Sequence, residues 1–220
     1  MTKFGLVFLV LLAGAAAASL AQRSAADAAA GPDVTGNKRL TALAGATLYV
    51  LSAAIVVTVL DIRGLLTEHY LVGFLLIPPV AVKLGATGYR TVRYYAGSPS
   101  YRLAGPPPLL LRFVIAPLLV AATVVVFVTG LELWLFGLRY GDSWMTAHTL
   151  SAVVMMLAVT AHVVPHLRRS VETVAQAVSA PPRAAFSARS LVLGSLLLGA
   201  ALAVASLLYT SPFPPGAAGG

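Results

Sequence analysis

Two of the four histidines in this chain, His148 and His162, lie 14 residues apart (162 − 148) in a single apolar stretch. Fourteen residues of α-helix make about four turns and rise about 21 Å, so the two imidazoles share one helix face at different depths. Ionisable side chains inside a membrane segment are costly and usually functional. Imidazole is a common axial ligand of haem iron, and a haem-binding electron carrier is therefore the leading hypothesis.

The composition places these histidines in a membrane protein. Of the 220 residues, 59% are hydrophobic and 10% are charged, and the mean hydropathy is +0.89, whereas soluble domains carry about 25% charged residues. The apolar runs are long enough for spanning helices, which need roughly 20 residues, and they lack the alternation of barrel strands. The chain has no cysteine, which excludes disulfides and thiolate ligands. The net charge of +8 is spread over helix flanks, so nucleic-acid binding is not expected.

We therefore expect an all-α, polytopic membrane helix bundle of five or six transmembrane helices with a four-helix core. The apolar segments are residues 4–21, 40–60, 68–87, 109–136, 144–166 and 190–209. The expected organisation is an N-terminal hydrophobic helix or signal segment (1–21), a polar linker (22–39), the core (40–169), a cytoplasmic linker (170–189), a C-terminal transmembrane helix (190–210) and a disordered tail (211–220).

The basic residues set the expected orientation. A six-helix topology puts all but three of the 15 Lys and Arg residues on one side, the exceptions being Lys3, Arg63 and Arg139. The positive-inside rule makes that side cytoplasmic. The alternative is that residues 1–21 are a cleaved signal peptide, because an apolar run follows Lys3 and small residues precede position 22. The sequence leaves the fate of this segment open.

In the six-helix topology, His69 and His148 open two different helices at matching depth near the outer face. A bis-histidine haem takes one imidazole from each of two facing helices, and bundle cores hold such cofactors. His69 and His148 are therefore the predicted metal ligands, with Arg63 and Arg139 as partners of the haem propionates. Gly73, one turn after His69, would leave room for the macrocycle. The competing interpretation is that both histidines lie at the headgroup level without a metal.

The ligands for a second haem, near the cytoplasmic face, are incomplete. The position 14 residues after His69 is Lys83, where a two-haem protein would supply another histidine. Lys83 has three interpretations, which are snorkelling to the cytoplasmic interface, pairing with an anion, and ligating a haem as a neutral amine. His162 is a candidate for an inner haem, metal or quinone site, and His166 is expected at the headgroups. One haem b is expected, and a second is left open.

Glu132 is the only acidic residue deep in an apolar segment. Its carboxylate is a candidate to accept a hydrogen bond from a ligating histidine, an arrangement that fixes the imidazole ring. It is also a candidate to move protons at a quinone site. The alternative is that Glu132 has no specific function and lies at the outer membrane interface beside Trp134.

With His69 on one core helix and His148 and His162 on another, the chain resembles the membrane cytochromes b with four-helix haem cores, the b561-like and b/b6-like anchors of bacterial oxidoreductases. It is also similar to small bacterial membrane proteins with segments such as HYLVGFLLIPPVAVKLGATGYR and AGPPPLLLRF. The resemblance covers residues 40–169 and departs at Lys83, where a complete two-haem member has a histidine. It implies haem b binding and electron exchange between a membrane quinone and an external redox protein.

The resulting hypothesis is a multi-pass protein of the bacterial plasma membrane that serves as the haem b-binding, electron-transport subunit of an oxidoreductase. It is not expected to be a complete enzyme, because no nucleotide-binding loop, nucleophile elbow or zinc-protease motif is present. Two rivals stay open, a cofactor-free scaffold or accessory subunit and a small transporter. A scaffold would be colourless when purified. A transporter would need Glu132 or Lys83 for flux and would tolerate the loss of His69.

Overall fold

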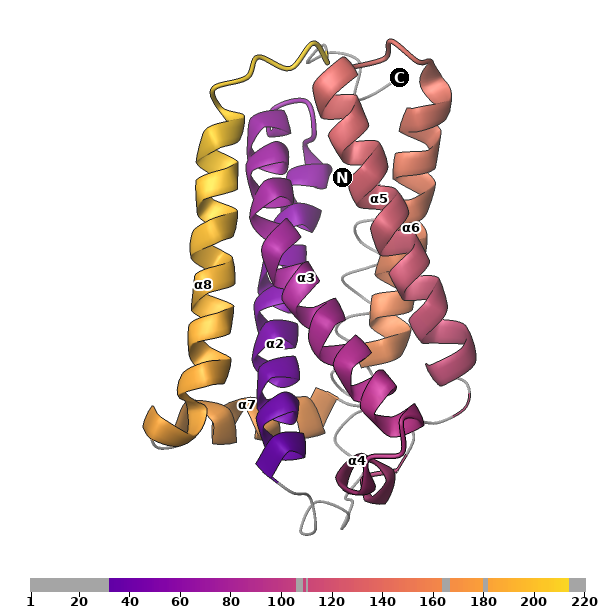
Figure 1. Ribbon diagram of the computed structural model, residues 1–220. Helices are drawn as coiled ribbons and strands as arrows, with labels where there is room; N and C mark the ends of the chain where they lie inside the picture. The colour runs from indigo at the N-terminus through magenta and orange to yellow at the C-terminus, as the bar shows by residue number, and fades with distance from the viewer. Residues whose placement is uncertain (1–31, 106–108, 110, 164–166, 180–181, 214–220) are drawn as a thin grey trace.

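The computed structural model describes residues 32–105, 109, 111–163, 167–179 and 182–213 (Figure 1). Every regular element within these ranges is a helix, as the composition predicts. Five of the helices are long and apolar enough to cross a membrane. The chain is thus a multi-pass, all-helical membrane protein. The first apolar segment, residues 4–21, lies outside the described residues.

The five spans follow the predicted segments. They are α2 (Pro32–Leu60), α3 (Leu66–Tyr95), α5 (Ala116–Phe136), α6 (Asp142–Val163) and α8 (Pro182–Ser206). The short helix α4 (Pro99–Leu103) and a π-helical turn (Leu111–Ile115) connect α3 to α5. Both α2 and α3 extend eight residues past the predicted segments (40 − 32 and 95 − 87). Their ends are rich in Lys, Arg and Tyr, which are stable in the headgroup layer and let the helix continue beyond the hydrocarbon.

The spans run alternately between two ends of the bundle (Figure 1). We call the end where α3 and α6 begin the histidine end; it includes loops 61–65 and 137–141. We call the other end, where α2, α5 and α8 begin, the basic end. Of the described basic residues, Arg63 and Arg139 lie in the two loops of the histidine end and Lys83 lies within α3. The remainder belong to the basic end, namely Lys38, Arg39, Arg90, Arg93, Arg102, Arg112, Arg168, Arg169, Arg183 and Arg189.

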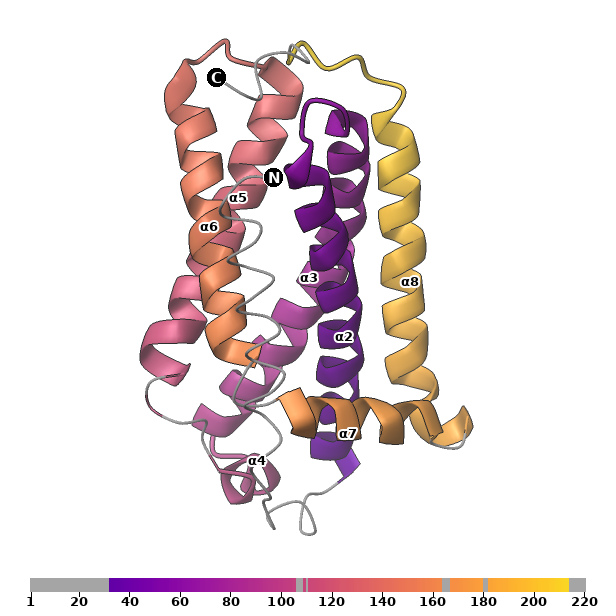
Figure 2. The same ribbon diagram turned by 180° about the vertical axis from the view of Figure 1, so that it is seen from behind.

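The spans pack as two groups. Helices α2, α3 and α8 pack against one another, α5 packs along α6, and α3 runs obliquely toward the foot of α5 (Figures 1 and 2). The two groups also meet toward the histidine end, where Phe74 of α3 contacts Trp134 of α5. The core therefore includes α8, which the sequence analysis placed outside it.

The close packing of α8 on α3 depends on a proline and a glycine. Pro79 has no N–H, so the carbonyl of Leu75 lacks its usual helical donor and remains available at the surface of α3. Gly199 of α8 lies against this carbonyl. A Cβ atom at position 199 would be only 2.5 Å from the Leu75 oxygen. The absence of a side chain at Gly199 therefore allows α8 to approach α3 this closely.

Helix α7 (Leu167–Ser179) lies across the basic end instead of spanning the bundle (Figure 2). It contacts α2, and Arg189 of α8 donates a hydrogen bond to the Val178 carbonyl at 2.6 Å. Its sequence is strongly amphipathic, and the valines Val171 and Val178 are exposed. Such a helix is typical of the membrane interface. The sequence analysis expected only a linker in this region.

A strap formed by residues 207–213 crosses the histidine end from α8 to α5 (Figure 1). The Tyr209 hydroxyl donates to the Leu135 carbonyl, and the Ser211 hydroxyl donates to the Trp134 carbonyl, both at 2.7 Å. Phe213 is buried, with 5% of its surface exposed. These contacts hold residues 211–213, which were expected to be disordered, against the bundle. The strap thereby ties the three-helix group to the α5–α6 pair.

Candidate functional site

His69 and His148 meet at the histidine end. His69 lies near the start of α3 and His148 near the start of α6. Their ring centroids are 6.3 Å apart, and the ring planes make an angle of 79°. Each helix group therefore contributes one imidazole to a site at their junction. The structure brings together the two histidines that the sequence analysis paired.

The bond of the Thr58 hydroxyl to the Ile55 carbonyl favours one tautomer of His69. Its Nδ1 atom lies 2.9 Å from the Thr58 hydroxyl oxygen, and the same hydroxyl donates its proton to the Ile55 carbonyl at 2.7 Å. A hydroxyl has one proton to donate, so Thr58 accepts from His69. The proton of the neutral ring is thus on Nδ1, and Nε2 retains a lone pair.

His148 is held in the same way. Its Nδ1 atom lies 3.0 Å from the Val126 carbonyl oxygen and 3.1 Å from the Thr129 hydroxyl oxygen. The Thr129 hydroxyl donates to the Val125 carbonyl at 2.6 Å, so both neighbours of Nδ1 accept hydrogen bonds. Nδ1 therefore carries the proton here as well, and the Nε2 lone pair of the neutral ring is available to a ligand.

These two rings suit axial ligation of a haem. A metal-ligating histidine almost always donates its other ring N–H to a carbonyl, carboxylate or water, which fixes the ring. With ring centroids 6.3 Å apart, His69 and His148 would be the residues that hold such a group. The described residues contain no cluster of three or more His, Asp or Glu. A haem would need only these two side chains from the protein.

Two glycines shape the space around the pair. A Cβ atom built on Gly130 would lie 2.9 Å from Cε1 of His148 and 3.3 Å from its Nδ1, so a larger residue would displace the ring. Gly73 is one turn below His69, and a Cβ atom there would meet no atom within 4 Å. Gly130 therefore accommodates the imidazole, and the surroundings of Gly73 are open.

Aromatic rings border the junction at the histidine end. Phe74 of α3 packs edge-on against Trp134 of α5, with ring centroids 4.8 Å apart. Trp134 in turn contacts Tyr209 of the strap at 4.7 Å. Such pairs contribute about 0.5–1.5 kcal/mol beyond their buried area. They join both helix groups and the strap, and so help to fix the distance between the two histidines.

The other residues predicted for the outer site occupy separate places. Glu132 does not orient a histidine, because Thr58, Thr129 and the Val126 carbonyl already accept the ring N–H bonds. Both carboxylate oxygens of Glu132 are buried and form no hydrogen bond within the described part of the chain.

The two arginines predicted for the outer site lie in the loops that flank it. Arg63 is exposed in loop 61–65. Arg139 is exposed in loop 137–141, and its guanidinium lies 5.8 Å from the ring centroid of Tyr140. Both loops belong to the histidine end, and arginines there are placed at the depth where the sequence analysis expected propionate partners.

Within the three-helix group, the structure gives Lys83 a role that the sequence analysis did not consider. The Lys83 ammonium donates to the Thr41 carbonyl of α2 at 2.7 Å and lies beside Gly45. It therefore bridges α3 to α2. His162 is half-buried in the last turn of α6, and His166 lies outside the described residues.

Sequence reasoning missed Thr58, Thr129 and Gly130, the residues that hold the two imidazoles. The available signal was weak: two threonines and a glycine in otherwise apolar segments, with no spacing that links them to a histidine. Comparison of the chain with protein-family models, curated proteins and solved structures gave no match.

Proposed function

We propose that this chain is an integral membrane, haem b-binding electron-transfer protein with His69 and His148 as axial ligands. The observation that carries the proposal is the pair itself. Two imidazoles from different helix groups lie 6.3 Å apart, each with its Nδ1–H donated to an acceptor on the protein. Two half-buried histidines in membrane-spanning helices are costly without a function, and this arrangement would leave both Nε2 lone pairs for iron.

Each neighbouring residue has a defined part in this proposal. Thr58 orients His69, and Thr129 with the Val126 carbonyl orients His148, as carbonyl and hydroxyl partners of ligating histidines do. Arg63 and Arg139 lie in the loops beside the site, where their guanidinium groups would pair with propionates. Haem b, when bound, accepts and releases one electron at a time.

The charge distribution supports an orientation for the site. The basic end carries most of the described Lys and Arg residues, and the positive-inside rule assigns it to the cytoplasm. The histidine end then faces outward, so the haem would exchange electrons with an external redox protein and with quinone in a bacterial plasma membrane. Lys83 is engaged with α2, which favours a single haem.

The test is the haem content of the full-length protein purified in detergent after expression with ample haem. The proposal predicts a b-type reduced-minus-oxidised spectrum and one haem per chain by pyridine haemochrome. A colourless protein would overturn the proposal and favour a cofactor-free scaffold. Two haems per chain would require a further ligand, and His162 would then be the first residue to replace.

A further inference from the structure

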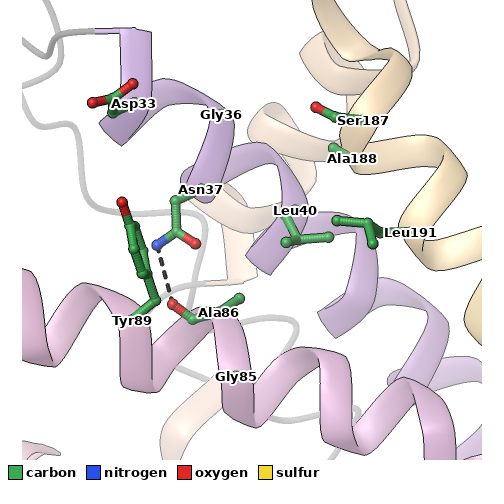
Figure 3. Close-up of a pocket in the computed structure, with 10 residues that line it drawn as sticks. All are labelled: Asp33, Gly36, Asn37, Leu40, Gly85, Ala86, Tyr89, Ser187, Ala188 and Leu191. Carbon is green, nitrogen blue, oxygen red and sulfur yellow. Dashed lines mark hydrogen bonds between the residues drawn. The ribbon is translucent and has the colours of Figure 1, made fainter.

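A cleft of about 370 Å³ opens between the basic ends of α2, α3 and α8, far from the histidine pair (Figure 3). Asp33 and Asn37 of α2 face Tyr89 and Ala86 of α3 across it, and Ser187 of α8 lies on its third side. Neither the proposed haem site nor the strap reaches this cleft. The cleft is therefore a separate feature of the basic end.

The lining changes from polar to apolar with depth. Asp33, Tyr89 and Ser187 belong to the helix turns nearest the basic end, whereas Leu40 and Leu191 lie further along their helices toward the membrane centre. The same gradient occurs on helices of both chain directions. A cleft with a polar mouth in the headgroup layer and an apolar floor in the hydrocarbon fits an amphiphile that has a small head and an acyl chain.

The polar groups of the cleft favour a cationic head. The amide nitrogen of Asn37 donates to the Ala86 carbonyl at 3.1 Å, which leaves its carbonyl oxygen as an acceptor. Asp33 adds a carboxylate, which accepts only, and it is the one charged residue among the described residues that line the cleft. None of the arginines whose side chains the structure describes is among its lining residues. An ammonium with N–H donors suits this set, and an anionic head does not.

We propose that this cleft binds a phospholipid with a primary-amine headgroup, phosphatidylethanolamine. Its ammonium lies between Asp33 and the Asn37 carbonyl oxygen, with the hydroxyls of Tyr89 and Ser187 beside it. Its acyl chain follows Leu40 and Leu191 into the bilayer. The phosphate remains outside the cleft, in the layer of arginines at the basic end.

The experiment compares lipids that differ only in the headgroup amine. The full-length protein in detergent is titrated with phosphatidylethanolamine, its N-methylated forms and phosphatidylcholine of identical acyl chains, and bound lipid is counted by native mass spectrometry. Charge-assisted hydrogen bonds to the primary ammonium, which choline cannot form, predict about tenfold tighter binding of the first phosphatidylethanolamine. Equal binding of the two lipids, or preference for the anionic phosphatidylglycerol, would overturn the proposal.

Variants test whether the preference for phosphatidylethanolamine arises at this cleft. Asp33→Asn should reduce the tenfold preference to near unity, because it removes the only charge among the described residues that line the cleft. The matched control is Asp142→Asn, which alters the first turn of α6 at the opposite end and should leave the preference intact. Leu191→Trp fills the floor and should weaken the first binding event for both lipids. A preference that survives both Asp33→Asn and Leu191→Trp would place the lipid elsewhere and refute the assignment.

Discussion

Replacing Gly130 by alanine tests whether the position of the His148 ring controls haem binding. The added Cβ atom would lie 2.9 Å from Cε1 of His148, and carbon atoms pack at about 3.5–4.0 Å. The ring must therefore move by at least about 0.6 Å. Its Nδ1 bond to the Val126 carbonyl is 3.0 Å long, and a shift of that size takes it beyond the usual range of about 2.7–3.2 Å.

Loss of such a supporting bond typically lowers metal affinity about 10–100-fold. We expect Gly130→Ala to weaken haem binding by this factor in a titration of the haem-free protein with haemin, followed by visible absorbance. Alanine favours the helix over glycine by about 0.8–1.0 kcal/mol, so a loss of haem affinity would not reflect lower helix propensity at this position. Circular dichroism and gel filtration would verify that the variant remains folded.

The control for Gly130→Ala is Gly88→Ala in α3, where the added Cβ atom would meet no atom within 4 Å. This variant should bind haem like the wild type. If Gly130→Ala also kept the wild-type affinity, the ring position would not limit haem binding, and the reasoning from the glycine contact would be refuted.

Three further substitutions test other parts of the account. Thr129→Val removes an acceptor from the His148 N–H and should lower haem affinity, up to the 10–100-fold typical of such partners. The control Thr149→Val, on the exposed face of α6, should leave haem affinity unchanged. Equal haem titrations of the two variants would contradict the role assigned to Thr129. Gly199→Ala would place Cβ 2.5 Å from the Leu75 oxygen and should cost about 1–3 kcal/mol of stability through overpacking. Its thermal midpoint should be lower than that of Gly194→Ala, whose Cβ meets nothing within 4 Å. Similar midpoints would argue against the close packing of α8 on α3. Lys83→Met keeps the aliphatic part of the side chain and removes the hydrogen bond to α2. This variant should retain one haem per chain. Loss of the haem would make Lys83 part of the haem site.

Much of the fold could be predicted from hydropathy, because spanning helices need long apolar runs and the chain contains them. The segments at 40–60 and 68–87 correspond to α2 and α3, although their helical ends extend into residues such as Arg39 and Arg93. The amphipathic helix α7 could have been predicted from its periodicity, since its charged residues alternate with valines at helical spacing. Hydropathy alone gives no signal for a helix that lies in the interface plane.

The packing of the spans could not be predicted in the same way. The contact of α8 with α3 depends on Gly199 meeting the Leu75 carbonyl that Pro79 leaves available, and neither glycine nor proline identifies its partner in sequence. The strap depends on hydroxyl groups that donate to main-chain carbonyls at the end of α5, which a Pro/Gly-rich tail does not indicate.

The pairing of His69 with His148 could be anticipated, because the alternating direction of spanning helices puts both at one end. The tautomers could not, since they depend on Thr58 and Thr129 and on which carbonyl each hydroxyl faces. The bond from Lys83 to Thr41 was likewise hidden, because a lysine in an apolar segment has several ways to satisfy its charge. The helices could thus be predicted from composition, whereas the side-chain contacts depend on how the helices pack.

The most direct test of the central claim is the haem content of three histidine variants beside the wild type. Each full-length protein would be purified in detergent and measured by reduced-minus-oxidised spectrum and pyridine haemochrome. Haem ligation by His69 and His148 predicts one haem b in the wild type and in His162→Ala, and none in His69→Ala or His148→Ala. A wild-type protein without haem, or full haem content in His69→Ala and His148→Ala, would contradict it.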